Sequence, residues 1–149
     1  MQVETVDYKA ADASTTLARS LRDTGFAVLA NHPITPDRIT EIYDGWGDFF
    51  AGEDKFDYAV QPPAHDGYFA FRSENAKDSP VKDLKEFFHV YPGCGLPAEL
   101  TEMTRRIYAD LNALGCELLA WIQAEAPASL TESLSMPLDT MMDDSKQSL

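Results

Sequence analysis

One apolar stripe limits the fold more than any other feature of this sequence. Between Pro97 and Glu125, apolar residues recur at steps of three and four: Leu100, Met103, Ile107, Leu111, Leu114, Leu118 and Ile122. This spacing places them along one face of a helix. The stripe therefore predicts a long helix over about residues 97–125, and a stripe this regular indicates core packing, not a chemical role.

Two shorter helices are predicted upstream of the long one. The first covers residues 14–24, with Ser14 as its N-cap and Gly25 as its stop signal. The second begins at Thr35-Pro36, a capping residue followed by a proline that fits the first helical position, and ends near Ala51. Its buried face is expected to carry Ile39, Ile42, Trp46 and Phe49. A short helix is also expected near residues 138–142.

Three short apolar stretches are candidates for strands. They cover residues 26–30, 67–72 and 86–91, and the first is expected to be buried. Residues 53–66 and 73–83 are polar and contain prolines, so they are expected to form loops. The pattern predicts one α+β domain over residues 1–149, mostly helical, with a few short strands.

The charge balance excludes one class of partner. The chain carries 25 acidic and 12 basic residues, so nucleic acid would be repelled, and the pair Arg105-Arg106 is too small a basic patch to change this. The sequence contains no apolar segment near the roughly 18 residues that a membrane span needs, and its first residues show no secretory signal. We therefore expect no membrane partner and a cytoplasmic location.

The residues that could perform chemistry form no recognisable catalytic pattern. The three histidines, His32, His65 and His89, occur at no standard metal-ligand spacing, and His32 is expected to make a local hydrogen bond at a strand end. Cys94 lies in a Gly-Cys-Gly loop, where it is either a reactive thiol or an incidental residue. The sequence therefore predicts no catalytic residue and no metal ligand, and an enzyme using Cys94 or a histidine is the weakest hypothesis.

One small group of residues suggests binding. Tyr68, Phe69, Phe71 and Arg72 place aromatic rings and a cation on one predicted strand, beside a polar loop. A guanidinium can hold a substrate carboxylate through two parallel hydrogen bonds. The alternative interpretation is an edge-strand arginine that lies over an aromatic core.

Several segments, in order, resemble one known family. Residues 24–34, TGFAVLANHPI, are similar to the "GFFYVVNHGI" stretch of the non-haem dioxygenase N-terminal region. Residues 67–77 and 83–90 are similar to the "GY…SENAK…DLKEFFHV" run of bacterial isopenicillin N synthase-like oxygenases, which depend on iron(II) and 2-oxoglutarate. Residues 142–149 resemble the segment that leads into the first jelly-roll strands.

The resemblance implies a specific fold and cofactors. Such enzymes hold Fe(II) through a His-x-Asp…His triad and 2-oxoglutarate through an Arg-x-Ser pair on a double-stranded β-helix, although isopenicillin N synthase itself uses no 2-oxoglutarate. No position here matches those motifs, so neither cofactor is expected to bind this chain alone. The chain would be the helical buttress of the jelly roll, and Tyr68, Phe71 and Arg72 would face a small-molecule substrate.

Two main hypotheses follow. The first is the N-terminal portion of an iron- and 2-oxoglutarate-dependent oxidoreductase, not catalytically competent alone because the chain stops before the iron-binding motifs. The second is a standalone acidic interaction module that kept the fold without the chemistry. In either case an exposed part of the long apolar stripe would favour self-association.

Overall fold

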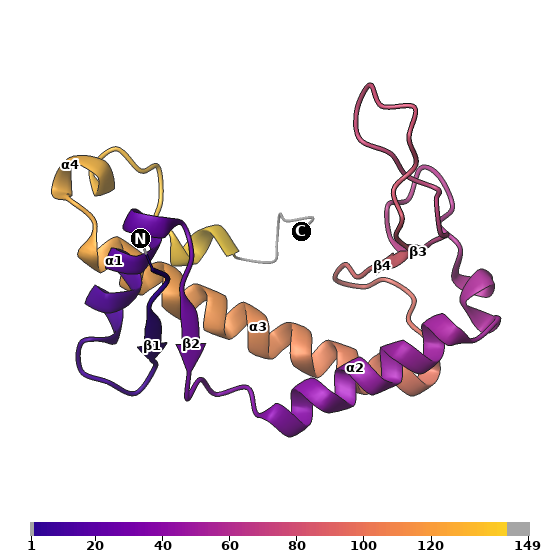
Figure 1. Cartoon of the computed structure of the whole chain (residues 1–149), viewed down its shortest axis with the longest axis horizontal. Helices are drawn as coiled ribbons and strands as arrows, with labels where there is room; N and C mark the ends of the chain where they lie inside the picture. Colours follow the sequence, from indigo (N-terminus) through magenta and orange to yellow (C-terminus); the bar gives the residue numbers. More distant parts are fainter. Residues whose placement is uncertain (1, 143–149) are drawn as a thin grey trace. The chain divides into compact units, whose positions relative to one another are not determined.

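The computed structural model describes residues 2–142 and shows a mixed α/β fold with few, short strands (Figure 1). Contacts divide these residues into two compact units, one built from residues 2–39 and 106–142 and the other from Thr40–Arg105. In chain order the elements are β1 (Thr5–Asp7), α1 (Ala13–Thr24), β2 (Val28–Ala30), α2 (Pro36–Ala51), η1 (Asp54–Tyr58), β3 (Gly67–Phe69), β4 (Phe87–His89), α3 (Ala98–Glu125), α4 (Ala128–Thr131) and η2 (Asp139–Met142).

The core of the first unit lies between a small sheet and two helices. Strands β1 and β2 pair in parallel, with Val6 opposite Leu29. Val6 is 1% exposed and packs with Ala13 and Leu17 of α1. The C-terminal part of α3 covers this cluster with half-buried residues of the predicted stripe, Leu118 and Ile122, together with Trp121. The stripe is therefore a packing surface here, as predicted.

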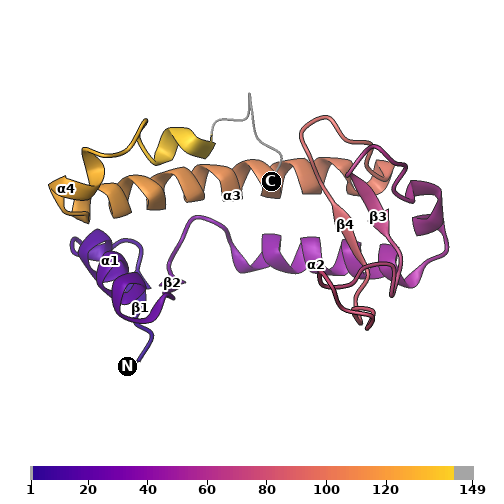
Figure 2. The same ribbon diagram turned by 90° about the horizontal axis from the view of Figure 1, so that it is seen from above.

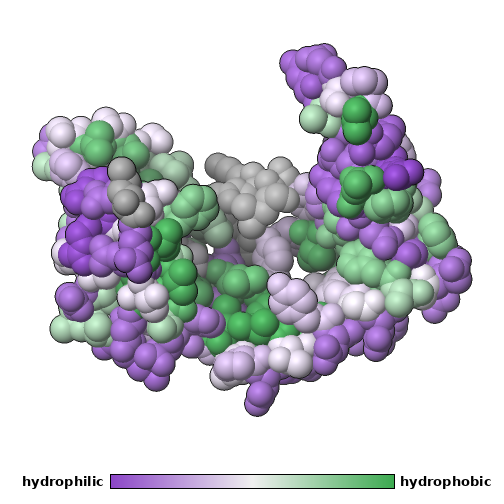
Figure 3. Space-filling view, viewed as in Figure 1, coloured by the Kyte–Doolittle hydropathy of each residue, from purple (hydrophilic) through white to green (hydrophobic). Residues whose placement is uncertain are grey.

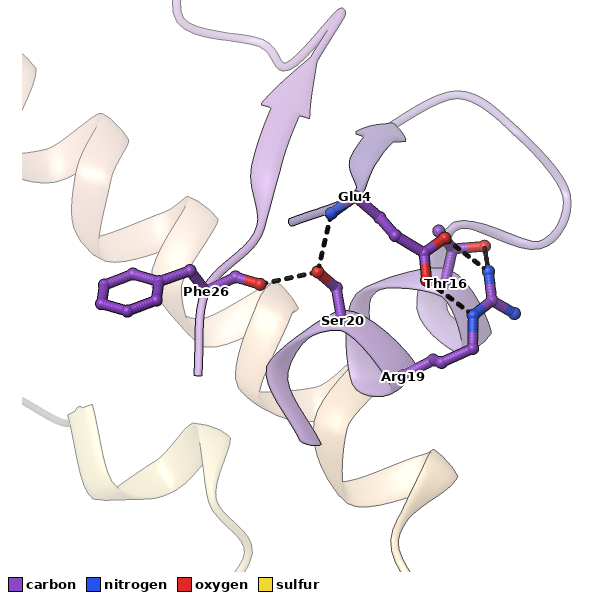
Figure 4. A network of polar contacts seen from close by, with 5 residues as sticks. All are labelled: Glu4, Thr16, Arg19, Ser20 and Phe26. Carbon is purple, nitrogen blue, oxygen red and sulfur yellow. Dashed lines mark hydrogen bonds and ion pairs between the residues drawn. The ribbon is translucent and has the colours of Figure 1, made fainter. Parts of the chain in front are cut away.

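A buried serine ties this unit together (Figure 4). Ser20 is 1% exposed, accepts a 3.0 Å hydrogen bond from the Glu4 backbone N–H, and donates a 2.6 Å bond to the Phe26 carbonyl oxygen. At the surface, Arg19 forms two 2.7 Å hydrogen bonds to the Glu4 carboxylate. Helix α1 is thereby joined to the segments that precede both strands.

The start of α1 differs from the prediction, whereas its end agrees with it. The helix begins at Ala13 after Asp12, and Ser14 is not its cap; the Ser14 hydroxyl instead donates a 2.8 Å bond to Glu125 in α3. A tertiary partner therefore replaced the local one. Gly25 ends the helix at φ 80°, and its N–H donates to the Leu21 carbonyl oxygen.

The prediction of a buried strand over residues 26–30 is wrong in part. The strand exists but covers only Val28–Ala30, and one face is open: Phe26 is 70% exposed and Val28 is 54% exposed. Only the face that carries Leu29 packs on the core. The two-stranded sheet thus leaves apolar side chains uncovered.

In the second unit, the end of α2 packs on the start of α3. The α2 bounds agree with the prediction, and the Thr35 hydroxyl accepts a hydrogen bond from the Arg38 N–H at its start. Gly45 permits the close packing, because a Cβ atom built there would lie 2.9 Å from Sδ of Met103. At the next residue, Trp46 Nε1 donates a 3.0 Å bond to the buried Thr104 hydroxyl.

The long helix was predicted with nearly correct bounds, but its stripe is not uniformly buried. Leu100 and Leu114 are buried, whereas Leu111 is 55% exposed. Other elements were missed: β1, α4, and the 3-10 helix η1 inside a predicted loop. Residues 143–149, which carry most of the predicted approach to the jelly roll, lie outside the described residues. No helix of the described residues is long and apolar enough to cross a membrane.

Candidate functional site

The candidate site is the hairpin formed by β3 and β4, which lie side by side in Figures 1 and 2. The strands are antiparallel, with Tyr68 opposite Phe88 and Phe69 opposite Phe87. Gly67 begins the hairpin at φ +108°, and a Cβ atom there would come within 2.6 Å of the Tyr58 carbonyl oxygen. Only glycine fits this position, where the chain that follows η1 runs parallel to β3 and pairs with it at Ala59 and Tyr68.

One face of the hairpin packs into the second unit. Tyr68 is 2% exposed, and the Phe88 ring lies 5.0 Å from the Trp46 ring, measured between centroids. The surrounding rings meet at tilted or edge-on angles, the arrangement that aromatic side chains favour in a core; they belong to Phe49, Phe50, Phe56 and Tyr58. This face is therefore a core that fixes the hairpin in place.

A polar group lies at the edge of this core. The Glu86 carboxylate accepts a 2.5 Å hydrogen bond from the Tyr68 hydroxyl and a 3.0 Å bond from Lys55 Nζ. Burial, helped by the Glu86 carboxylate, raises the pKa of Tyr68 to about 12. The hydrogen bond from Tyr68, supported by Lys55, holds the pKa of the Glu86 carboxyl below its ordinary value. Tyr68 thus stays protonated and Glu86 ionised near neutral pH.

The opposite face of the hairpin is an open row of rings. Phe69 and Phe87 stack with centroids 4.6 Å apart and planes 10° apart, and the His89 ring lies 4.7 Å from Phe87. Lys85 Nζ lies 4.9 Å from the Phe87 centroid at one end, and Tyr91 follows His89 at the other. We call Phe69, Lys85, Phe87, His89 and Tyr91 the open aromatic face.

The predicted strand over residues 67–72 ends early, at Phe69, because the chain turns. The Ser73 N–H donates to the Ala70 carbonyl oxygen at 2.9 Å, and Arg72 occupies the third turn position at φ 62°. Glycine is the residue that favours this conformation. Arg72 is therefore not on an edge strand, as one interpretation of the sequence had it, but on an exposed turn.

The structure separates the three residues singled out from the sequence. Phe71 and Arg72 are both exposed and lie together, with the guanidinium carbon 5.3 Å from the Phe71 ring centroid. Among residues 2–142, Arg72 has no carboxylate partner within ion-pair distance. Tyr68 lies instead on the buried face.

Sequence reasoning missed the open aromatic face as a unit. Its signal was present, since Lys85, Phe87, His89 and Tyr91 alternate along one strand and its extension. The His89 Nδ1 atom lies 3.1 Å from the His65 carbonyl oxygen. His32, by contrast, does not make the expected bond through Nδ1, which is buried without a partner in the described part of the chain.

The described residues do not fit an iron site. No cluster of three or more histidine, cysteine, aspartate or glutamate side chains in residues 2–142 could hold a metal ion. Hollows lie away from the hairpin in both units. One of about 360 Å³ is bordered by the carboxylates of Asp48, Asp54 and Glu99. Another, of about 520 Å³, is mainly apolar and lies between α1 and the end of α3.

Comparison with known proteins identifies several solved structures with a similar fold. A Shewanella oneidensis protein of known crystal structure, assigned as an oxygenase, is 40% identical in sequence to this chain over 95% of its length. The two structures superpose with a TM-score of 0.85. A Caulobacter crescentus protein assigned to the 2OG-Fe(II) oxygenase family is 29% identical over 83% of the chain, with a TM-score of 0.64. A full-length Neurospora crassa protein in complex with alpha-KG and thymine shares the fold at 20% identity and a TM-score of 0.67.

These structures are longer than this chain. The chain spans 49% of the Shewanella oneidensis protein and 48% of each of the other two. No curated protein sequence matches at a significant level. The family described as "non-haem dioxygenase in morphine synthesis N-terminal" matches residues 3–107, more than half of the sequence. The resemblance seen in the sequence is confirmed: the chain belongs to the non-haem dioxygenase N-terminal family.

Proposed function

We propose that this chain is the N-terminal portion of an iron(II)- and 2-oxoglutarate-dependent oxidoreductase that acts on a small molecule, and that it is not catalytically competent alone. The family match over residues 3–107 is the observation that carries the proposal. The 40% identity to a protein assigned as an oxygenase supports it. Since the chain spans about half of the structures it resembles, the oxidation belongs to the complete enzyme.

Fe(II) and 2-oxoglutarate would be bound by other parts of that enzyme. The side chains of residues 2–142 do not fit an iron site, so we assign no oxidation step to them. These residues would contribute a surface on which the rest of the enzyme packs and a surface that faces the substrate. The contribution of the chain is therefore support and substrate binding.

The supporting role rests on apolar surface that the chain leaves uncovered. Phe26, which precedes β2, Val28 in β2 and Leu111 in α3 are all more than half exposed. Exposed apolar residues gathered on one element are typical of surfaces that another part covers. We propose that the double-stranded β-helix of the complete enzyme covers them, and that the chain alone self-associates through them.

The substrate-binding role rests on the turn after β3. Arg72 and Phe71 are exposed together, and Arg72 keeps a conformation that glycine would adopt more easily. A strained backbone conformation at an exposed, charged residue indicates that function constrains that position. We propose that Arg72 binds a substrate carboxylate beside the Phe71 ring, while Tyr68 holds the hairpin from its buried side.

The test uses the protein purified from its natural source, and variants of that same full-length protein. We expect an intact mass well above the 16.5 kDa of this chain and iron-dependent conversion of 2-oxoglutarate to succinate. Replacement of Arg72 by Gln should raise the KM for the organic substrate roughly tenfold, the worth of one charge-assisted hydrogen bond. Lys77→Gln, also exposed near the hairpin, is the matched control.

Two outcomes would contradict the proposal. A natural protein of 16.5 kDa without 2-oxoglutarate turnover would favour the standalone interaction module. An unchanged KM in Arg72→Gln, with turnover intact, would remove Arg72 from the substrate site.

A further inference from the structure

The open aromatic face has features that core packing does not require. The opposite face of the same two strands already carries the rings that pack into the second unit, including Tyr68 and Phe88. In contrast, Phe69 and Phe87 are only half-buried and His89 is exposed. Figure 3 shows hydrophobic residues among hydrophilic ones at the surface of this part of the molecule. Two faces of one hairpin thus carry aromatic rings, and one of them is open.

Charge makes this face different from the rest of the chain. Residues 69–91 contain four basic and four acidic side chains, whereas the rest of the sequence holds the other eight basic and 21 acidic ones. The charges of residues 69–91 therefore cancel, and an anion is repelled less there than by the acidic chain on average. Lys85 lies 4.9 Å from the Phe87 ring centroid and 3.3 Å from Asp83. Both side chains of that ion pair are exposed, so the pair contributes little and a ligand carboxylate can replace it.

His89 adds a directional requirement. Its Nδ1 lies 3.1 Å from the His65 carbonyl oxygen, which can only accept, so Nδ1 carries the hydrogen. In the neutral ring, Nε2 is then an acceptor, and it makes no hydrogen bond to the described residues. A ligand with a hydroxyl or N–H group on its ring would satisfy that nitrogen.

From these three features we infer that the open aromatic face binds a planar aromatic acid whose ring carries one hydrogen-bond donor. The ligand ring packs on Phe69 and Phe87, its carboxylate meets Lys85, and its donor meets Nε2 of His89. Aromatic rings favour offset or edge contacts with one another, and a flat ligand can cover this row of side chains. This inference goes beyond the proposed function, because it assigns a ligand to residues other than Phe71 and Arg72.

The experiment uses the 149-residue chain and three small probes. 4-Hydroxybenzoate has all three features, 4-hydroxycyclohexanecarboxylate lacks only the aromatic ring, and 4-hydroxybenzylamine has the opposite charge. Binding is followed by the shift of the His89 ring protons in NMR titrations. We expect 4-hydroxybenzoate to bind roughly three- to tenfold more tightly than either other probe, the range that one aromatic or cation–ring contact supports.

Matched variants locate the binding. Lys85→Gln removes the cation, Phe87→Leu removes a ring but keeps an apolar side chain, and each should weaken 4-hydroxybenzoate binding roughly three- to tenfold. Lys77→Gln removes an exposed cation outside the open aromatic face and should leave binding unchanged. A thermal melt of each variant shows whether it is folded. Where Phe87→Leu fails to fold, Lys85→Gln and the three probes still decide.

Each other result overturns the inference. Equal binding of all three probes, or equal binding to Lys85→Gln and the unsubstituted chain, would show nonspecific contact with apolar surface. Failure of the proposed function would look different. It would appear as absence of 2-oxoglutarate turnover in the natural protein, and it would leave probe binding to the 149-residue chain unaffected.

Discussion

The Tyr68 hydroxyl donates a 2.5 Å hydrogen bond to Oε2 of Glu86, and the same oxygen accepts a 3.0 Å bond from Lys55 Nζ. Lys55 also donates to the Phe50 carbonyl oxygen, at the end of α2. The three side chains come from η1, β3 and the residue before β4. Through the Glu86 carboxylate they connect the hairpin to the end of α2.

The first prediction concerns the hydroxyl of Tyr68. Tyr68→Phe keeps the buried ring but removes a hydrogen bond to a charged group, which should lower the free energy of unfolding by about 1.5–3 kcal/mol. Urea unfolding followed by circular dichroism measures the loss. Tyr43→Phe is the control, since Tyr43 is 75% exposed and its hydroxyl removal should have little effect. Equal stability of the two variants would mean that the Glu86 contact contributes nothing.

The second prediction concerns pH. The pKa of Glu86 is lowered in the folded chain, mainly by the Tyr68 hydrogen bond, from an ordinary value of 4.5. Its stabilising effect is therefore complete above pH 4.5 and is lost as the pH falls through the lower folded-state value. Glu86→Gln should be less stable than the unsubstituted chain at pH 7, with the difference shrinking below pH 4.5. A difference that stays constant from pH 7 to acid would contradict this assignment.

The third prediction compares two glycines in α2. Nothing lies within 4 Å of a Cβ atom at Gly47, so Gly47→Ala should stabilise the helix by about 0.5–1 kcal/mol. At Gly45 the added methyl would meet Met103 and Leu100, with the closest atom at 2.9 Å. Overpacking costs about 1–3 kcal/mol, so Gly45→Ala should be destabilising despite its better helix propensity. Thermal melts with opposite signs for the two variants are the expected result.

The fourth prediction separates buried from exposed polar contacts in the first unit. Ser20→Ala leaves the partly buried N–H of Glu4 without its partner and should cost about 1–3 kcal/mol. Arg19→Gln breaks an ion pair whose side chains are 45% and 36% exposed, so it should cost less than Ser20→Ala. Chemical unfolding of both variants tests the order. A larger loss in Arg19→Gln would reverse our account of this network.

The fifth prediction links stability to the site. Arg72 has φ 62°, a backbone conformation that costs a residue with a Cβ atom about 1–2 kcal/mol. Arg72→Gly should relieve this cost, partly offset by the greater freedom of glycine in the unfolded chain, for a net gain of about 0.5–1 kcal/mol. Unfolding in urea measures the gain. If Arg72→Gly is instead destabilising, the stacking of Arg72 on Phe71 outweighs the backbone cost.

Local signals explain what could be predicted from the sequence. The repeat from Leu100 to Ile122 and the Thr35-Pro36 start describe α3 and α2 almost completely, because helices depend on neighbouring residues. Strand β1 was missed because it has little apolar pattern of its own. It forms by pairing with β2, which lies far from it in the sequence. Short strands of this kind depend on tertiary contacts.

The site was only partly predictable for the same reason. Arg72 and Phe71 were identified, but no glycine marks the turn that exposes them, so a strand was expected there. The alternation through Phe87 and His89 was visible in the sequence. Which side of the hairpin stays open is decided by the packing of Tyr68 against rings from α2 and η1, and no local pattern contains that information.

The division of the chain into two units affects the order in which the protein can form during synthesis. The second unit is one continuous stretch, Thr40–Arg105, whereas the first joins residues 2–39 to residues 106–142. A ribosome therefore releases everything that the second unit needs before Leu118 and Ile122 have left the exit tunnel and can cover Val6. During translation the strands and helix at the N-terminus therefore keep their apolar residues uncovered until the end of α3 emerges.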